Sequence, residues 1–237
     1  MRFGHIVFIV LAWILLFTSV YAEVKRYEIK SGKVEYTVRG DGQIMGMKMS
    51  TKGTYSIVFK EWGKVEVTKG VTESTIPMQG TQVENEWSKF DNGKIFWVDE
   101  EEKVIVTADM ASGMFEQDGK NFTKMGREML EQNGGKLIGH EKLMGYKCEV
   151  WQWGNESKIW IHKGIMLKSE VSMMGITTVE EAIKVDFNVK TTSSDFALPN
   201  YPVKTMEEAY GQMDGDLSPE EKALMQEMLK GLGSMGQ

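Results

Sequence analysis

The sequence of residues 146–189, YKCEVWQWGNESKIWIHKGIMLKSEVSMMGITTVEEAIKVDFNV, contains four runs in which apolar residues alternate with charged or polar ones. The runs are residues 146–153, 157–162, 165–172 and 182–189. Because side chains alternate between the two faces of a strand, these runs predict an antiparallel sheet with one apolar and one polar face. The apolar face of such a sheet has to be covered, and what covers it bears directly on function.

The same alternation is present in the first half of the chain and extends the predicted apolar face. On one parity it places Val34, Tyr36, Val38, Met45, Met47, Met49, Tyr55, Ile57 and Phe59. Turn residues at 40–42 and a break at Gly53 separate these runs, so they predict an up-and-down meander. Residues 94–98 and 103–107 predict another hairpin, whereas residues 69–92 are polar and weakly patterned and predict a long loop or irregular strand.

Helical signals are few. Residues 121–132 end at a run of Asn and Gly, a common helix stop, and place four apolar residues at helical spacing: Phe122, Met125, Met129 and Leu130. Ser218 and Pro219 suit the start of a second helix over residues 219–229. A shorter helix is predicted over residues 206–212. The apolar stripe of the first helix would cover part of the sheet.

Residues 1–22 have the pattern of a signal peptide. A short polar start with Arg2 and His5 precedes an apolar core of about a dozen residues, which is shorter than the about 20 residues of a membrane span. Val20-Tyr21-Ala22 suits cleavage after Ala22, and no cysteine follows the cut. We therefore expect an exported, soluble protein without a lipid anchor, in the periplasm of a Gram-negative cell.

Composition and motifs argue against several classes of function. The formal net charge of −6 argues against non-specific nucleic-acid binding. Cys148 is the single cysteine, which excludes an internal disulfide, and its apolar parity predicts a buried, inert thiol. The sequence lacks the HExxH, CxxC, GxGxxG and GKS/T motifs. We expect neither an enzyme nor a bound cofactor.

Two groups of residues leave alternatives open. The chain has 18 Met, and the Met45, Met47 and Met49 series is core filling, a deformable lining for an apolar ligand, or a thioether site for Cu(I). The second group is Trp151, Trp153 and Trp160, which the alternation assigns to the polar face. They either form a partner-docking patch or pack beneath a loop or helix.

Three segments resemble the C-terminal half of the LolA/LolB/RseB-like superfamily: GHEKLMGYKCEVW at 139–151, IWIHKGIMLKSEV at 159–171 and VDFNVKTTSSDFALP at 185–199. The resemblance implies an α+β fold, a strongly curved antiparallel sheet or open half-barrel, with helices covering its concave apolar face. It also implies a cavity between sheet and helices that takes lipid or acyl chains. The extension from about residue 205 is not part of the pattern.

Together these observations predict a signal peptide at residues 1–22, a half-barrel domain at 23–204 and a helical extension at 205–237. The predicted function is to bind or carry a lipid or other apolar molecule, with an envelope protein as an additional partner. To the lining residues already named we add Ile159, Ile161 and Leu167. The helix containing Phe122 to Leu130 is the predicted lid, and the one at 219–229 is a second candidate.

Overall fold

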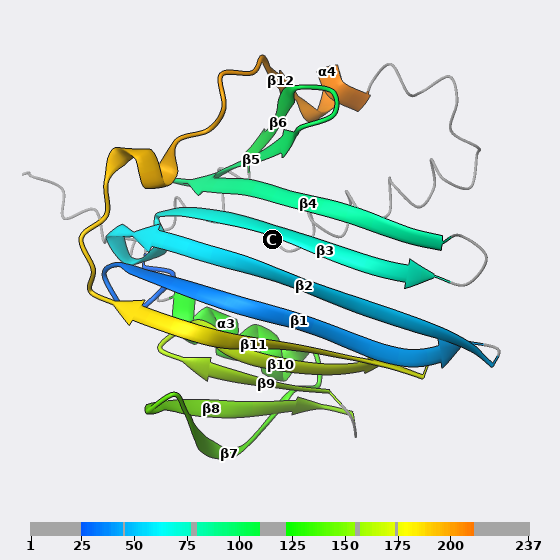
Figure 1. The fold of residues 1–237 in the computed structure, drawn as a ribbon. Coiled ribbons are helices and arrows are strands. Elements are labelled where there is room, and N and C mark those ends of the chain that lie inside the picture. The colour runs from blue at the N-terminus through cyan, green and yellow to red at the C-terminus, as the bar shows by residue number, and fades with distance from the viewer. Residues whose placement is uncertain are drawn as a thin grey trace, which may run out of the picture.

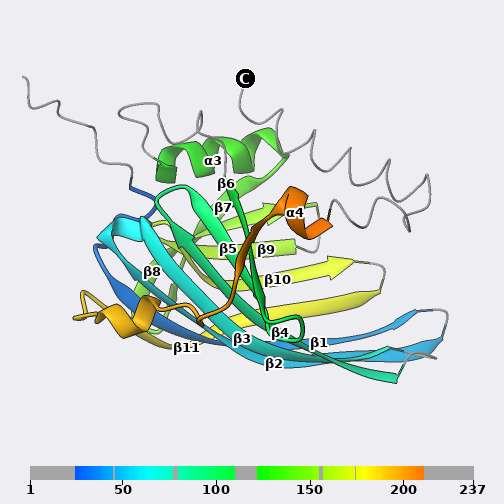
Figure 2. The ribbon, with the colours of Figure 1, turned by 90° about the horizontal axis from the view of Figure 1, so that it is seen from above.

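The structure is a computed structural model and describes residues 25–44, 46–76, 80–109, 122–154, 157–173 and 175–210. Within these residues, twelve strands form one unclosed sheet in the order β12-β6-β5-β4-β3-β2-β1-β11-β10-β9-β8-β7. Neighbouring strands are antiparallel except β12, which runs parallel to β6. The sheet is strongly curved, and its concave side is visible from above (Figure 2).

Two meanders make up this sheet. The first comprises β1 (Gly32–Ile44), β2 (Met47–Lys60), β3 (Val65–Ile76), β4 (Gly80–Asp91), β5 (Lys94–Asp99) and β6 (Val104–Asp109). The second comprises β7 (Lys136–Leu143), β8 (Tyr146–Trp153), β9 (Ser157–His162), β10 (Ile165–Met173) and β11 (Ile176–Phe187). β1 pairs with β11, which joins the two meanders at the middle of the sheet (Figure 1).

Short elements connect or flank the strands. They are η1 (Glu61–Gly63), α3 (Phe122–Gln132), η2 (Ser193–Phe196), β12 (Val203–Thr205) and α4 (Met206–Tyr210). None of the helices among the described residues is long and apolar enough to span a bilayer. The predicted strand runs, the hairpin β5–β6 and the helix α3 are confirmed, and the helix predicted at 206–212 is confirmed as far as Tyr210, where the described residues end. The predicted turn at residues 40–42 and the predicted break at Gly53 are wrong, because β1 and β2 continue through these positions and pair without interruption from Gly32 opposite Phe59 to Ile44 opposite Met47. The predicted signal peptide and the predicted helix at 219–229 lie outside the described residues.

Residues 69–92 were predicted to be a long loop or an irregular strand, and the loop is wrong, because most of the segment belongs to the regular strands β3 and β4. β3 and β4 pair without interruption from Val65 opposite Asp91 to Ile76 opposite Gly80. Apolar alternation is weak here because many positions carry Thr, Ser or Glu, yet the β-branched Thr residues suit a strand. The hairpin is extended because β3 pairs along its length with β2, and this pairing partner lies elsewhere in the sequence.

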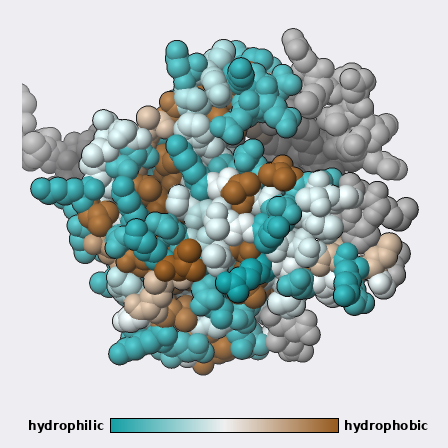
Figure 3. Space-filling model, in the orientation of Figure 1, coloured by the Kyte–Doolittle hydropathy of each residue, from teal (hydrophilic) through white to brown (hydrophobic). Residues whose placement is uncertain are grey.

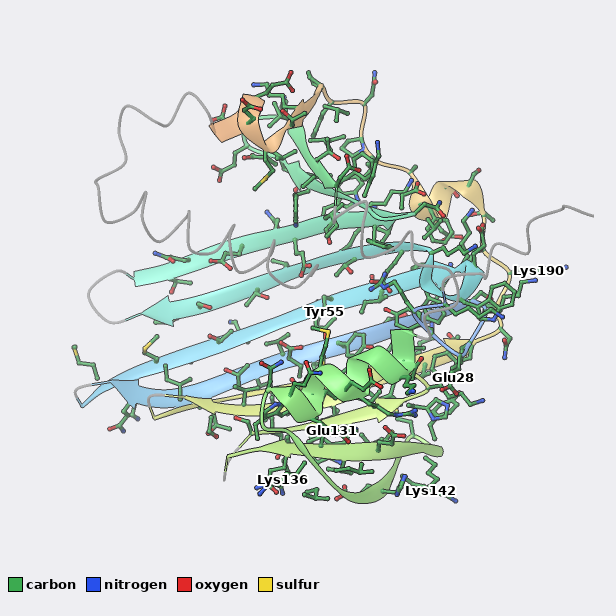
Figure 4. All side chains as sticks on the ribbon, turned by 180° about the vertical axis from the view of Figure 1, so that it is seen from behind. Glu28, Tyr55, Glu131, Lys136, Lys142 and Lys190 are labelled. Atoms are coloured by element: carbon green, nitrogen blue, oxygen red, sulfur yellow. The ribbon has the colours of Figure 1, made fainter. Side chains whose placement is uncertain are left out.

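β7 was not predicted, and its bulge explains why. The pairing with β8 shifts between Leu137 and Gly139, so Ile138 is an extra residue in the ladder. A bulge places neighbouring apolar residues out of alternation. Leu137 and Ile138 are both about half exposed, and Lys136 and Lys142 flank them on this outermost strand (Figure 4). Lysines and a bulge are common protection for a sheet edge.

A second bulge corrects the predicted apolar parity of β11. Phe187 and Val185 face Gly32 and Val34 of β1, but the register shifts before Tyr36 pairs with Ala182. The extra residue is Ile183, which is 52% exposed rather than on the apolar face. Because side-chain orientation has a period of two, one inserted residue reverses the parity of the rest of the strand.

The buried residues form two clusters. The larger one joins β1, β2 and β11 to β8, β9 and β10, and its members are Ile29, Val34, Tyr36, Phe59, Cys148, Val150, Trp160, Ile165, Leu167 and Ala182. The prediction that Cys148 is buried is confirmed, and burial raises the pKa of its thiol. In the smaller cluster, Phe196 of η2 packs on Val65 and Val67 of β3.

Candidate functional site

A cavity of about 320 Å³ lies where the segment before β1 meets the middle of the sheet. Its lining residues are Arg26, Tyr27, Tyr36, Ile57, Gly164, Ile165 and Met166. Backbone hydrogen bonds fix the segment in place: the Tyr27 amide donates to Trp62 O at 3.0 Å, and the Glu28 amide donates to Lys163 O at 3.1 Å. The segment thereby bridges the end of β2 and the turn between β9 and β10.

Tyr36 forms part of the wall and stacks on Tyr55, which lies beside the cavity. The rings of Tyr36 and Tyr55, opposite each other on β1 and β2, lie 4.4 Å apart at an interplanar angle of 9°. The Tyr36 hydroxyl donates to Met166 O at 2.7 Å, and the Tyr55 hydroxyl donates to Glu180 Oε2 at 3.0 Å. Burial, followed by nearby carboxylates, raises the pKa of both phenols, so both are neutral at physiological pH. They present apolar ring surface with their hydroxyls already bonded.

A charged corner closes one end of the cavity. Arg26 donates to Gly63 O at 3.1 Å and to Glu66 Oε1 at 3.3 Å, while the Tyr27 hydroxyl donates to the other oxygen of Glu66. The Arg26 guanidinium also lies 4.4 Å from the centre of the Phe90 ring. Burial first, then Glu66, raises the pKa of Tyr27 well above its usual value. The corner anchors the segment before β1 to β3.

The inner face is defined here as the face that carries Tyr36, Tyr55 and Ile57. Register shows that its character changes beyond β2, because Phe59, Ile57 and Tyr55 lie opposite Glu66, Thr68 and Gly70 of β3. The next strand continues with Ser88, Glu86 and Glu84 opposite Thr68, Gly70 and Thr72. The inner face is therefore apolar on β1 and β2 and polar on β3 and β4. The prediction that one apolar face extends across most of the domain is wrong for β3 and β4.

Glu86 reaches this boundary because Gly70 lies between it and Tyr55. A Cβ at Gly70 would come within 2.4 Å of the Tyr55 Cβ, so the position has no room for a side chain. Partial burial, followed by the charge of Glu180, raises the pKa of Glu86. Glu86 and Glu180 thus flank the tyrosine pair from opposite sides.

The predicted lining residues have different positions in this arrangement. Tyr36 and Ile57 line the cavity, and Tyr55 stacks beside it. Val34, Phe59 and Leu167 are at most 1% exposed and belong to packed core. Val38 is buried, whereas Ile159 and Ile161 are half-buried on β9. Met47 and Met49 share the inner face at the far end of β2, opposite Ile44 and Gly42, and Met45 lies outside the described residues. A copper site remains a prediction.

Helix α3 is attached to the inner face. Arg127 donates from Nε and Nη2 to the Glu149 carboxylate at 3.0 and 2.7 Å. Glu149 shares its side of β8 with Trp151, and register connects Trp151 through Ile159, Ser169 and Glu180 to Val38 on β1. Figures 2 and 4 show α3 on the concave side, the side that carries Tyr55. Of the predicted lid residues, Leu130 is half-buried and Met129 is 37% exposed; the side chains of Phe122 and Met125 lie outside the described part.

The prediction that Trp151, Trp153 and Trp160 share one exposed face is wrong. Trp151 pairs with Ile159 and Trp160 pairs with Val150, so the side chains of Trp151 and Trp160 point to opposite faces. Trp151 is 1% exposed and Trp160 is 5% exposed. Their indole N–H groups donate to Glu149 at 3.2 Å and to Glu141 at 2.8 Å. Trp151 and Trp160 are therefore packed, which agrees with the second of the two alternatives, and Trp153 is half-buried.

Several cavity residues were not predicted from the sequence. Arg26 and Tyr27 precede the first strand and belong to no alternating run. Gly164 lies at a turn, and Met166 lies at a position that the alternation assigns to the polar face. A Cβ at Gly164 would meet Arg26 O at 2.9 Å, which gives this glycine a steric role that tertiary contact alone reveals.

The face of the sheet that points away from α3 shows small apolar patches among polar residues (Figure 3).

No family model matches the sequence, and no curated protein matches it. Among solved structures, the chain is similar to an uncharacterized conserved protein from Thermus thermophilus, at 10% identity and a TM-score of 0.38, over 83% of this chain and 99% of that one. It is similar to MucB at 10% identity and a TM-score of 0.35, over 76% of this chain and 61% of MucB. It is also similar to a putative outer membrane lipoprotein-sorting protein domain from Vibrio parahaemolyticus, at 12% identity and a TM-score of 0.30, over 72% of this chain and 91% of that domain.

All three solved structures are at most 12% identical to this chain, and their TM-scores lie below 0.5. Similarity at such low TM-scores carries no argument about ligand or activity. The function therefore has to be inferred from the geometry of this chain.

Proposed function

We propose that the protein is a periplasmic binding or carrier protein that holds the apolar part of a lipid or acyl chain against the inner face of its sheet. The observation that carries this proposal is the cavity of about 320 Å³ beside Tyr36 and Ile57. Its volume lies at the lower end of the range of about 300–1,000 Å³ that is usual for ligand pockets. Ile165 and Met166 complete its apolar wall, and Met suits ligands of variable shape.

The division of the inner face supports an amphipathic ligand. The chain of such a ligand would contact Tyr36, Tyr55 and Ile57, and its polar group would lie over Thr68 and Glu86 of β3 and β4. Burial of an acyl CH₂ group contributes about 0.8 kcal/mol, so about eight of them contribute roughly 6 kcal/mol before the cost of association. A cavity of this size therefore fits moderate, reversible binding, as a carrier requires.

In this proposal α3 acts as the lid. Its attachment is the bidentate pair between Arg127 and Glu149, whose side chains are 41% and 22% exposed. A partly exposed pair contributes about 1 kcal/mol or less, so it can break without unfolding the sheet. The exported state rests on the pattern of residues 1–22, and cell fractionation of the full-length protein tests it.

The proposal is tested by ligand recovery and by direct binding. Native mass spectrometry of gently purified protein should detect a bound lipid, and the fluorescent fatty acid parinaric acid should bind and be displaced by palmitate. Replacing Ile57 with Trp fills the cavity and should weaken binding at least tenfold. The matched control is Thr54→Trp, an exposed position on the opposite face of the same strand, which should bind as the wild type does.

Two results would contradict the proposal. Absence of co-purified lipid, together with parinaric acid binding that is too weak to measure, would remove the carrier function. Equal binding by Ile57→Trp and wild type would show that the fatty acid binds elsewhere.

A further inference from the structure

A second hollow lies beside β4 and shares Glu86 with the part of the inner face proposed above for the polar group of the ligand. It measures about 730 Å³ and is bounded by β4, the β5–β6 hairpin and α4. β5 pairs with β4 only from Asp91 to Ser88 and then diverges from it. Among the strands of the described residues, none pairs with that edge of β4 before Ser88 (Figure 1).

This part of β4 offers backbone groups for pairing. In an antiparallel strand, alternate residues direct their N–H and C=O groups to one edge, so residues 83–87 present to the hollow backbone groups that no other described strand pairs with. The side chains of Val83, Glu84, Asn85 and Glu86 are exposed, and Val83 is 61% exposed. No bulge or lysine interrupts residues 83–87, in contrast to the protected edge strand β7.

The charge around the hollow is strongly one-sided. Five carboxylates are among its lining residues: Glu84, Glu86, Asp99, Glu100 and Glu101. Among the described lining residues there is no Lys or Arg. Apolar surface lies between the carboxylates, notably Val83 and Trp97, which is 40% exposed. A basic occupant matches this combination electrostatically.

We propose that the edge of β4 at residues 83–87 binds an extended peptide segment in which basic and apolar residues alternate, by adding it to the sheet as a strand. Glu84 and Glu86 lie on one face of β4, and Val83 lies on the other. Cross-strand neighbours share a face, so the added strand places Lys or Arg beside the two glutamates and an apolar residue beside Val83. Backbone pairing supplies affinity and the alternation supplies specificity.

The probe is a fluorescein-labelled synthetic peptide, acetyl-KVKVKVK-amide, titrated with the full chain and followed by anisotropy. It should bind, whereas acetyl-EVEVEVE-amide should not. Glu84→Gln with Glu86→Gln should weaken binding about tenfold, since each exposed charge pair changes affinity by roughly two- to fivefold. The matched control, Glu131→Gln with Glu181→Gln, removes two exposed charges elsewhere and should leave binding unchanged.

Two N-methylated forms of the probe separate strand pairing from simple charge attraction. A strand has two edges, so methylating the amides of one alternating set should abolish binding, and methylating the other set should be tolerated. If both methylated peptides bind like the parent, charge alone holds the probe and the proposal is wrong. A stable dimer that the peptide cannot displace would equally overturn it, since a second copy would then occupy this edge.

Discussion

The two halves of the inner face use the same architecture with different chemistry. On β1 and β2, Val34, Tyr36 and Phe59 are at most 1% exposed. On β3 and β4, the corresponding rows carry Thr, Gly, Ser and Glu, and the β4 edge is exposed. Pairing with a neighbour is therefore enough to extend a strand, whereas burial and its stabilisation are concentrated where apolar alternation is strong.

The largest expected effect contrasts a core aromatic with an edge residue. Phe59→Ala removes a 0%-exposed ring that packs edge-on against Tyr27 with ring centres 4.8 Å apart, and we expect a loss of about 3–5 kcal/mol. Val83→Ala at the β4 edge should change stability by no more than about 0.5 kcal/mol. Urea denaturation followed by far-UV circular dichroism measures both. Similar losses would mean that the polar half is as tightly packed as the apolar one.

The charged corner lies between the two halves and gives the next effect. Glu66→Ala leaves Arg26 and Tyr27 without their carboxylate, and the Arg26 and Glu66 side chains are 26% and 11% exposed. Removing one partner of a fully buried pair costs about 3–5 kcal/mol, so roughly 2–3 kcal/mol is expected here. Glu66→Gln keeps a hydrogen-bond acceptor for Tyr27 and should recover part of the loss. An equal loss in both variants would show that charge, not the Tyr27 contact, matters.

The attachment of α3 predicts a pH dependence. Burial opposes ionisation of Glu149, but hydrogen bonds from Arg127 and Trp151 outweigh it and lower its pKa below 4.5. A lowered pKa in the folded state contributes stability above pH 4.5 that is lost as the pH falls through the folded value. Arg127→Ala should lower the free energy of unfolding by about 1 kcal/mol at pH 7. It should also make the loss of stability at low pH smaller than in the wild type. Thermal unfolding between pH 3 and 7 tests it, with the exposed Lys124→Ala as control; parallel curves for wild type and Arg127→Ala would contradict it.

The smallest effect concerns η2, which covers the outer side of β3. The Lys33 ammonium, with the Thr192 amide, lowers the pKa of Asp195 to about 2. Its contribution is present above pH 3.8 and is lost as the pH falls through about 2. Lys33→Met should raise this pKa and cost at most about 1 kcal/mol. Carboxyl carbon NMR against pH checks the shift, and an unchanged pKa would mean that the Thr192 bonds suffice.

The sequence predicted the elements in which burial of one face produces a regular spacing of apolar residues along the chain. Alternation predicted β8 to β11, β1 and β2, and helical spacing followed by Asn-Gly-Gly predicted α3. It also predicted that Cys148 is buried. Within the candidate site, Tyr36 and Ile57 were predicted on the same grounds. β3 and β4 lack a regular apolar spacing, and β3 is a strand because it pairs with β2, a contact that the local sequence does not contain.

The features that local patterns missed depend on partners distant in the chain. The bulge at Ile183, the opposite orientations of Trp151 and Trp160, and the union of Arg26 with Glu66 follow from register and packing between separate strands. Local patterns contain no information about which strand lies opposite or where a ladder gains a residue. The amino-acid order alone therefore defines which segments are strands with an apolar side, and long-range packing defines which of those sides close into core and which leave a cavity.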